Sequence, residues 1–531
     1  MKLLKLLLFL VVLIVPSYSQ EEGRSSTGVE LPDFVITGKD VVKIKKSEKL
    51  NPFLISTFSE KFVLPTYSPE EIPVKDILLP IRDDLNLLGS GNFFKGYVSG
   101  AVGLYSLPDL DLLYASPIEN GIFRAKFNGL YNRPFVDNSD FYKLSGNADL
   151  IYWTDINSSF LPGTQIRLNT DLSTKGYKFY GSDNPTNKRS LNNLFFNLNL
   201  KNEYNSAFLF KINAFDNFTL LSDENFKENL IDLSLNTLLR LSFINVGFSG
   251  NYKNVSIKND TTDHKELNYF LIRPTAGFQF TNLVKGSFGF TISQSSEDRF
   301  IMPYAELAVK LAPSFTFMGE FNPSTEFLTP ANFLKINPYF NAVKSTNLFV
   351  KKSMQYLLSV KYEYQKFFEI NGGFKYFSSD SLPYFYEKEK GKYSIRFSDI
   401  KQMTPFINFN FFPGPFGFFF GSIEVNAAQN DTGQTFPYVP TFKVTANYGY
   451  TFSEVLTTAL NLTYSGKTFT DLDNFNKIDN YINLGLLLSY NFDQRFDFFV
   501  RLENLLDNSN SIWNNYPEKP FDLILGVKYK L

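Results

Sequence analysis

The sequence predicts an all-β protein, a transmembrane antiparallel β-barrel of about 22 strands (range 18–24) with a short irregular N-terminal segment. Three observations support this prediction: long stretches of period-two alternation, connections that alternate between short and long, and an unusual composition. Aromatic residues make up 17% of the 531 residues, yet the mean hydropathy is only -0.15. That combination suits a molecule that is apolar on its outside and wet on its inside.

Residues 1–19 have the pattern of a signal peptide. Two lysines precede an unbroken apolar run at residues 6–15, and Pro16 ends this run. Small residues before the expected cleavage point place it near Ser19 and Gln20. The run is too short to cross a bilayer as a helix, and no later stretch reaches the roughly 18 apolar residues that a membrane helix needs. An exported chain that spans a membrane without such helices must do so as a closed barrel.

Residues 20–92 differ from the rest of the chain. They carry six prolines and dense charge, and they show neither helical periodicity nor sustained alternation. We interpret them as an irregular segment with little core of its own, either periplasmic or filling a lumen.

Residues 93–531 are predicted to form the barrel. Apolar and polar residues alternate in strand-length stretches, most clearly at 194–201, 442–452, 456–465 and 482–492. Such alternation is typical of a strand with one apolar and one polar face. Strands of about 9–12 residues have the length that a tilted strand needs to cross a bilayer.

The connections between these strands fall into two classes. Ten are short: Ser116–Gly121, Asp155–Gly163, Tyr204–Ser206, Phe243–Asn245, Thr281–Val284, Ala312–Ser314, Tyr364–Phe367, Phe412–Phe416, Phe452–Val455 and Phe492–Phe496. Six longer segments are polar: Lys175–Ser190, Val255–Asn268, Ser378–Gln402, Ala427–Pro437, Gly466–Asn480 and Asp507–Pro520. Ten short turns join twenty strands, and one strand at each end gives about 22. Short turns on one rim and long loops on the other are typical of outer-membrane barrels. Soluble sandwiches or propellers also alternate, but their strands average about five or six residues.

The last strand supports the same prediction. Its apolar face consists of Leu523, Leu525, Val527, Tyr529 and Leu531. This face resembles the C-terminal strand that the barrel-insertion machinery reads in outer-membrane proteins, although a terminal Leu replaces the more usual Phe.

Parts of the sequence resemble the TonB-dependent receptors. Residues 500–507, Trp513 with Tyr516 and residues 525–529 look like the last two strands of that family. Near the mature N-terminus, one short stretch is similar to the apolar box of such receptors: Asp33, Phe34, Val35, Ile36, Thr37 and Gly38. The resemblance implies a barrel for solute uptake, coupled to a periplasmic protein that supplies energy. The family also carries a plug domain in the barrel, and residues 20–92 are too few for a full plug.

Several charged residues fall on the polar strand faces, which should line the lumen: Lys211, Lys443, Arg501, Glu503 and Lys528. Both signs occur, so no strong selectivity for anions or cations follows. A charge on the lipid face near the midplane would cost about 2–4 kcal/mol, which favours an inward orientation.

Composition excludes most site chemistry. The chain has no cysteine and one histidine, His264, so thiol catalysis and cysteine or multi-histidine metal sites are excluded. His264 lies in a polar stretch and is interpreted as a solvated residue. The acidic stretch at 470–474 is interpreted as an ordinary loop rather than a calcium site, and the phenylalanines at 416–421 as part of an interfacial aromatic girdle. A net charge of -1 gives no reason to expect nucleic acid.

We therefore expect an outer-membrane barrel of a Gram-negative bacterium that takes up a solute. We expect no enzymatic activity, catalytic residue, cofactor or metal. Its partners would be outer-membrane lipid, the barrel-insertion machinery, an unknown solute, and an energy-coupling periplasmic protein or another outer-membrane subunit. The alternatives are a plug-less scaffold within an outer-membrane complex and a passive porin.

Overall fold

The computed structural model describes residues 95–531, except 160, 203–206, 242, 260–261, 281–282, 297, 343–347, 365–366, 415 and 453–454. The described residues all belong to one compact unit. The predicted signal peptide, residues 20–92 and with them the stretch Asp33–Gly38 lie outside the described residues.

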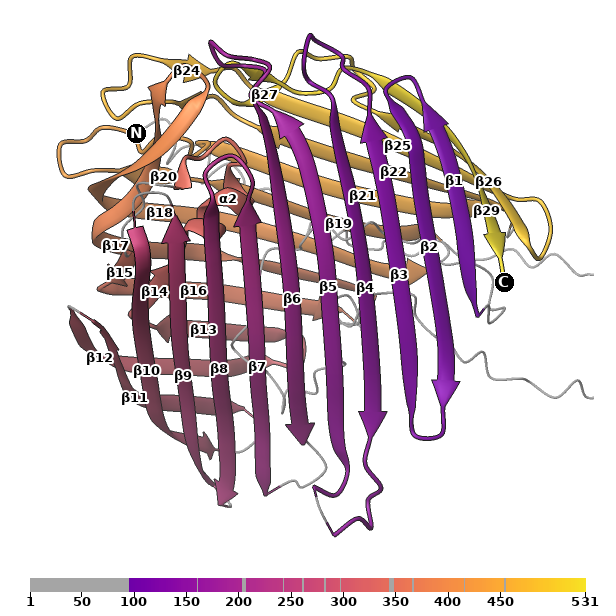
Figure 1. Ribbon diagram of the computed structural model, residues 1–531. Helices are drawn as coiled ribbons and strands as arrows, with labels where there is room; N and C mark the ends of the chain where they lie inside the picture. Colours follow the sequence, from indigo (N-terminus) through magenta and orange to yellow (C-terminus); the bar gives the residue numbers. More distant parts are fainter. Residues whose placement is uncertain are drawn as a thin grey trace, which may run out of the picture. The chain divides into compact units, whose positions relative to one another are not determined.

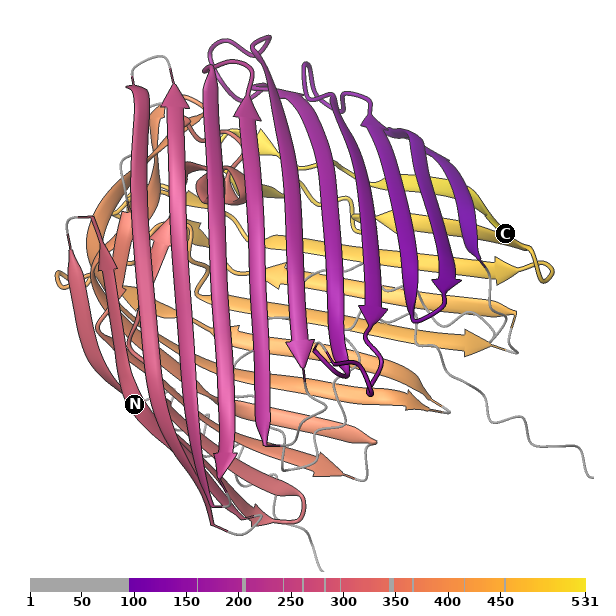
Figure 2. The ribbon, with the colours of Figure 1, turned by 60° about the horizontal axis from the view of Figure 1, so that its bottom comes forward.

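The described chain forms a closed antiparallel barrel (Figures 1 and 2). Its strands are β1 (Gly96–Gly103), β2 (Ser106–Ile118), β3 (Gly121–Asn132), β4 (Phe141–Trp153), β5 (Thr164–Lys178), β6 (Lys188–Asn202), β7 (Phe208–Leu221), β8 (Phe226–Leu241), β9 (Ile244–Asn259), β10 (Thr262–Phe280), β11 (Val284–Ser295), β12 (Arg299–Ala312), β13 (Phe315–Phe321), β16 (Met354–Tyr364), β17 (Phe368–Glu389), β18 (Lys392–Gly414), β19 (Gly417–Val425), β20 (Ala427–Gln429), β21 (Phe442–Phe452), β22 (Leu456–Ser465), β25 (Tyr481–Asn491), β26 (Phe496–Glu503) and β29 (Asp522–Lys530). Because β19 and β20 both pair with β18 and are separated only by Asn426, they form one interrupted strand. The 23 strand segments of the sheet thus make 22 barrel strands, which confirms the predicted fold and count.

The first and last strands close the barrel. Strand β1 pairs with β29 from Tyr97 opposite Lys530 to Gly103 opposite Ile524. Beyond the ladder, the Lys95 amide donates to the Leu531 carbonyl. The two strands therefore leave no open sheet edge, as a spanning β-structure requires.

The alternation of the sequence becomes the two faces of the wall. On β22, Leu460 is 38% exposed and lies opposite Tyr448 and Leu486 on the neighbouring strands. Large apolar side chains are exposed on nearly every strand, while polar side chains occupy the alternate positions. An apolar outer face and a polar inner face are what a membrane barrel needs. Among the described residues, no helix is both long and apolar enough to cross a membrane.

Each of the ten predicted short connections falls between two consecutive paired strands, and the strand ends on either side lie on one rim, which we call the short-turn rim. Two predicted polar loops are instead mostly strand. The segment 378–402 belongs to β17 and β18, which stay paired up to a tight tip at Lys390–Gly391, and 255–268 extends β9 and β10. Backbone pairing continues beyond the apolar band because polar side chains do not prevent it. His264 lies on β10 rather than in a loop.

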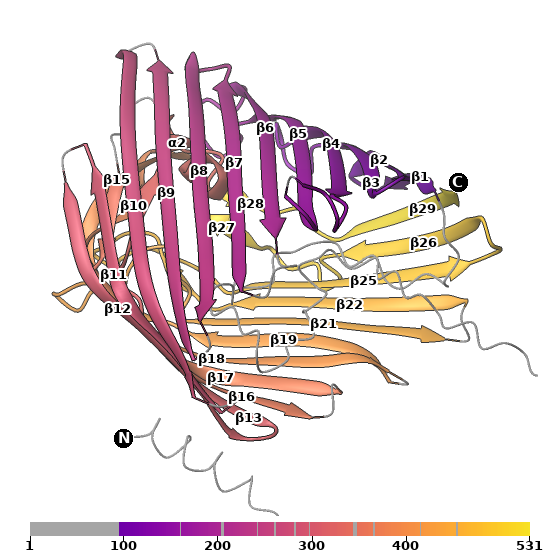
Figure 3. The same ribbon diagram turned by 90° about the horizontal axis from the view of Figure 1, so that it is seen from below.

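The chain between β13 and β16 forms an insertion that folds into the barrel at the opposite rim, which we call the long-loop rim. This insertion is not one of the six long segments predicted from the sequence. It contains β14 (Ser324–Leu328), helix α2 (Pro330–Ile336) and β15 (Leu348–Lys352), and β14 pairs with β15. Figure 3 shows α2 enclosed by the ring of strands. Two small hairpins lie in the loops of the same rim: β23 (Thr468–Phe469) with β24 (Lys477–Ile478), and β27 (Ser511–Trp513) with β28 (Tyr516–Pro517).

Among the described residues, the largest cluster of buried apolar side chains lies at this rim. Its buried members come from the insertion, from the β27–β28 hairpin and from the inward faces of the surrounding strands: Leu221, Phe226, Leu230, Val255, Ile257, Leu267, Tyr269, Phe327, Phe333, Leu334, Phe340, Ala342, Phe385, Tyr393, Trp513 and Tyr516. We refer to residues 324–342, 348–352 and 511–517 as the cap. The cap is packed against the wall like a small domain core, not suspended as solvated loops.

Candidate functional site

The cap is tied to the barrel wall by one buried arginine. Arg189, at the start of β6, is only 2% exposed and forms ion pairs with Asp223 and Glu224, in the turn between β7 and β8. Its Nη1 atom also donates to the carbonyls of Pro338 and Phe340, at 3.0 and 2.6 Å. One guanidinium thus joins two carboxylates of the wall to the backbone of the cap, using the fork of donors that arginine provides.

Two carboxylates of the wall accept hydrogen bonds from backbone amides of the cap. Glu228, fully buried on β8, accepts from the Ala331 amide at 2.9 Å. Glu224 accepts from the Ala342 amide, also at 2.9 Å. The Ala331 amide is at the first turn of α2, where helix N–H groups have no partner within the helix. Burial raises the pKa of the Glu224 carboxyl, and its pairing with Arg189 opposes that shift.

Stacked tyrosines join the insertion to the β27–β28 hairpin. The rings of Tyr339 and Tyr516 are parallel within 10°, with centroids 3.5 Å apart, and Tyr180 meets Tyr516 edge-on. The Tyr516 hydroxyl donates to the Gly391 carbonyl, and that of Tyr393 donates to the Asn514 carbonyl. Burial raises the pKa of both Tyr339 and Tyr516, so these hydroxyls remain neutral.

Three loops meet at two glycines. A Cβ atom on Gly181 would lie 2.3 Å from the Asn515 carbonyl oxygen. A Cβ atom on Gly391 would lie 2.7 Å from the Gly181 backbone, and Gly391 has a φ of +69°. Only glycine fits such a close approach together with this backbone conformation.

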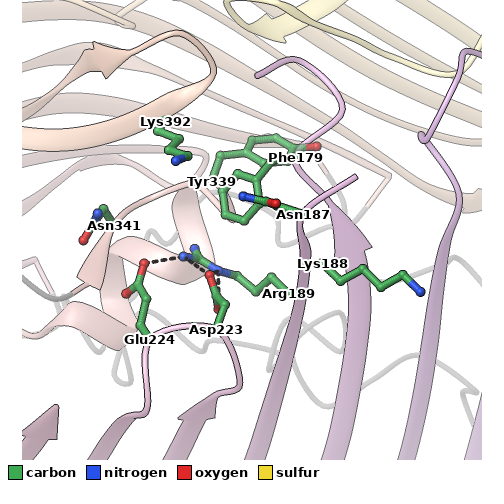
Figure 4. Close-up of a pocket in the computed structure, with 9 residues that line it drawn as sticks. All are labelled: Phe179, Asn187, Lys188, Arg189, Asp223, Glu224, Tyr339, Asn341 and Lys392. Carbon is green, nitrogen blue, oxygen red and sulfur yellow. Dashed lines mark hydrogen bonds and ion pairs between the residues drawn. The ribbon is translucent and has the colours of Figure 1, made fainter. Parts of the chain in front are cut away.

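A cavity of about 420 Å³ opens where the cap meets the wall. Figure 4 shows Arg189, Asp223 and Glu224 paired on one side and the rings of Phe179 and Tyr339 on another. The residues that line the cavity are Phe179, Asn187, Lys188, Arg189, Asp223, Glu224, Tyr339, Asn341 and Lys392. Amides, cations, carboxylates and aromatic rings together can recognise a polar solute, but they contain no nucleophile paired with a base.

The charged residues predicted for the lumen lie on the wall face opposite the exposed apolar side chains. Arg501 pairs with Asp109 of β2 and, at 3.1 Å, with Glu503. The Lys528 amine lies 4.6 Å from the centroid of the Tyr97 ring.

The other two predicted lysines occupy the same face. Lys443 is opposite Glu424, and Lys211 is opposite Lys201. The structure does not gather the five residues into one site; it distributes them around the wall.

The predicted insertion strand is β29 and the residue after it. Leu525, Val527 and Leu531 are 50%, 40% and 50% exposed on the outer face, and Tyr529 packs against Phe496. Recognition of this strand by the insertion machinery remains a prediction.

Sequence reasoning missed the cap. One local signal was present, because Thr329 followed by Pro330 is a typical helix start, and the Thr329 amide indeed donates to the Asn332 side chain. The partners of Arg189, however, are 34 to 151 residues away along the chain. Within the described residues, no group of three or more histidines, aspartates or glutamates is arranged to hold a metal ion.

Comparison with known proteins gives the fold a name. The structure is similar to the pyoverdine outer membrane receptor FpvA from Pseudomonas aeruginosa, with a TM-score of 0.61 and 11% identity over 84% of this chain and 79% of that one. It is also similar to the FrpB iron transporter from Neisseria meningitidis, with a TM-score of 0.62 and 11% identity over 83% and 82%. A copper transporter, OprC, matches with a TM-score of 0.60 and 11% identity over 83% and 81%. The barrel has the fold of the TonB-dependent receptors.

This similarity is one of structure. No protein-family model matches the sequence, and no curated protein matches it. At these sequence identities the comparison shows the fold alone, a barrel like that of the TonB-dependent receptors. By their names, the three similar proteins are a receptor and two transporters.

Proposed function

We propose that the protein takes up a solute across the outer membrane and that the cap is the gate of the pathway. Long loops of outer-membrane barrels face the cell exterior, so the cap is at the extracellular mouth. The observation that carries the proposal is the packed cap itself, whose polar anchors converge on Arg189.

A gate fits the structure better than a passive porin does. A porin needs an open aqueous lumen, whereas this mouth holds an apolar core that includes Phe333, Phe340 and Trp513. Opening requires the cap to separate from the wall, which breaks the contacts of Arg189, Glu224 and Glu228 together.

The solute is expected to be polar, and a bare copper ion is a poor candidate. Soft metal ions prefer thiolate, thioether and imidazole ligands. The whole chain has no cysteine, one histidine and five methionines. Amide, carboxylate and aromatic groups at the mouth suit an organic solute instead.

Energy coupling is part of the proposal. The stretch Asp33–Gly38 resembles the box through which TonB-dependent receptors contact their periplasmic partner, and cap opening is a step that needs work. Residues 20–92 would carry this contact.

The test replaces residues 324–352 by a short glycine–serine linker and measures conductance in planar bilayers. At the base of the insertion, the Asn322 amide donates to the Gln355 carbonyl, so β13 and β16 are already paired there. We therefore expect the two strands to stay paired in the variant. We expect low conductance from the intact protein and a rise of at least tenfold from the variant. Folding is checked by heat-modifiable migration on gels.

A matched control shortens the β23–β24 hairpin, which lies at the same rim outside the cap; its conductance should equal that of the intact protein. High conductance of the intact protein would indicate a passive porin. No rise in the folded variant would contradict gating by the cap, and a stoichiometric partner recovered from cross-linked membranes would then favour the scaffold alternative.

A further inference from the structure

A groove crosses the outer face of the wall where the first and last strands of the barrel pair. Its volume is about 680 Å³, and it extends from β2 across β1, β29, β26 and β25 to β22. Figure 1 shows these strands side by side near the C-terminus. The groove is on the outside, because its lining includes the outward side chains of Val102, Phe498 and Leu525, which are 52%, 45% and 50% exposed. We call it the outer groove; the cap is not part of it.

The outer groove is lined by two neighbouring rows of residues that are in register across the strands. One row consists of Val102, Leu525, Val500 and Leu488. The other consists of Gly100, Val527, Phe498, Tyr490 and Leu456. The outer groove therefore crosses the strands rather than following one of them, and it spans the junction between β1 and β29.

Gly100 leaves space in the second row. Its partners in register, Leu110 on β2 and Val527 on β29, both carry large apolar side chains. A Cβ atom on Gly100 would meet only the Leu110 side chain within 4 Å, at 3.8 Å. A glycine inside a strand often marks a place where another molecule approaches closely.

The dimensions and chemistry of the outer groove favour a hydrocarbon chain as its occupant. The two rows are two residues apart along each strand, or about 7 Å, whereas an α-helix with its side chains is about 10–12 Å wide. The strands that form the groove already pair with each other, so an extended peptide would find no free sheet edge. The lining side chains are apolar except for the Tyr490 hydroxyl, and water needs several polar partners.

The strands under the outer groove have short ladders. Strand β1 pairs with β29 only over Tyr97–Gly103, and β26 pairs with β29 over Phe496–Glu503, whereas β8 pairs with β9 from Lys227 to Leu241. An unfilled hollow would deprive its lining side chains of dispersion contacts. An occupant that contacts β1, β29 and β26 together restores those contacts where the barrel closes.

We propose that the outer groove binds an acyl chain of a membrane lipid, which packs across the junction of β1 and β29 and stabilises the closed barrel. Within a bilayer, such association depends on van der Waals fit, because lipid tails are as apolar as the wall itself. A chain in the groove gains contacts on several sides that a chain against the convex wall lacks. The proposal requires only the membrane barrel and is independent of the cap and of the solute.

The test uses native mass spectrometry on the full chain, stripped of lipid in detergent and then incubated with a phosphatidylethanolamine that has two palmitoyl chains. We expect the intact protein to retain one lipid under activation that removes all others. Gly100→Leu fills the hollow with its own side chain and should retain at least fivefold less lipid, and Gly100→Ala should show a smaller loss. Gly146→Leu is the matched control. Gly146 lies on the outer face of β4, a Cβ atom on it would have no neighbour within 4 Å, and it does not line the outer groove.

Thermal unfolding, followed by heat-modifiable migration on gels, tests the stabilising role. Adding the lipid should raise the melting temperature of the intact protein and of Gly146→Leu. It should change that of Gly100→Leu much less, because the new side chain already makes the contacts of the acyl chain.

Two results would overturn the lipid site: no lipid retained by the intact protein, or as much retained by Gly100→Leu as by Gly146→Leu. A melting temperature of the intact protein that does not respond to the lipid would contradict its role in closure. The measurements on the intact protein decide the matter even if Gly100→Leu does not fold.

Discussion

At the scale of single residues, the cap depends most on Arg189. Its side chain is buried, contacts two carboxylates and two carbonyls, and lies 4.6 Å from the centroid of the Phe179 ring. Removing one partner of a buried ion pair leaves the other charges without compensation and costs about 3–5 kcal/mol.

We therefore predict that Arg189→Leu detaches the cap without unfolding the barrel. Amide hydrogen exchange at residues 330–340 should accelerate at least about a hundredfold, since each 1.4 kcal/mol is a factor of ten, while exchange in β21 and β22 stays unchanged. Arg124→Leu is the control, because Arg124 pairs with Asp149 on the wall and Asp149 retains Arg167. Unchanged exchange at 330–340 in the Arg189 variant would contradict the anchoring role.

The two faces of the wall set a second prediction at this scale. Leu460 and Leu486 lie opposite each other on the outer face, whereas Lys443 lies on the inner face. A charge on the lipid face near the midplane costs about 2–4 kcal/mol. Leu460→Arg or Leu486→Arg should thus reduce the folded barrel in outer membranes several-fold, and Lys443→Ala should not. Equal assembly of all three variants would show that the faces are assigned wrongly.

At the scale of elements, the paired tip of β17 and β18 supports the cap through one glycine. Gly391 has a positive φ, contacts the Gly181 backbone and accepts the hydrogen bond from Tyr516. An alanine there would have both a strained backbone and a clash. Gly433 isolates the strain alone, because its φ is +82° but a Cβ atom on it would have no neighbour within 4 Å.

We predict that Gly391→Ala increases protease cleavage in residues 179–187 and 511–517, whereas Gly433→Ala does not. Backbone strain of this kind costs on the order of 1 kcal/mol or more, so the difference between the variants reports the clash between loops. If both variants are cleaved alike, the contact between Gly391 and Gly181 does not hold the cap.

The elements also show why the sequence predicted the wall and not the cap. Each wall strand is defined locally, since alternation such as Leu456 to Ser465 needs no knowledge of its neighbours. The cap core is assembled from residues such as Phe226, Phe333 and Trp513, which lie singly or beside one other apolar residue in segments without sustained alternation. Their burial depends on contacts between distant loops, and no local periodicity signals it.

At the scale of the whole molecule, closure connects the two ends of the barrel. The strand count followed from the alternation of short and long connections, because each short turn joins two strands and the pattern leaves one strand at each end. Those two strands, β1 and β29, are the ones that pair. Strand β29 therefore has two roles that the sequence alone does not separate: it closes the sheet, and it is the predicted signal for insertion.

Tyr529 separates these roles. Its ring packs against Phe496 with centroids 5.0 Å apart, a pair that contributes about 0.5–1.5 kcal/mol. That loss is small for a barrel, so Tyr529→Ala should still fold when the purified chain is diluted into detergent micelles, with a yield close to that of the intact protein. In cells, where the insertion machinery must read the strand, the same variant should accumulate at least fivefold less in the outer membrane.

Phe498→Ala, at an exposed position of the adjacent strand, removes an aromatic side chain without altering the terminal strand and should insert normally. A Tyr529 variant that inserts as well as the Phe498 variant would leave β29 with closure as its function and place the insertion signal elsewhere.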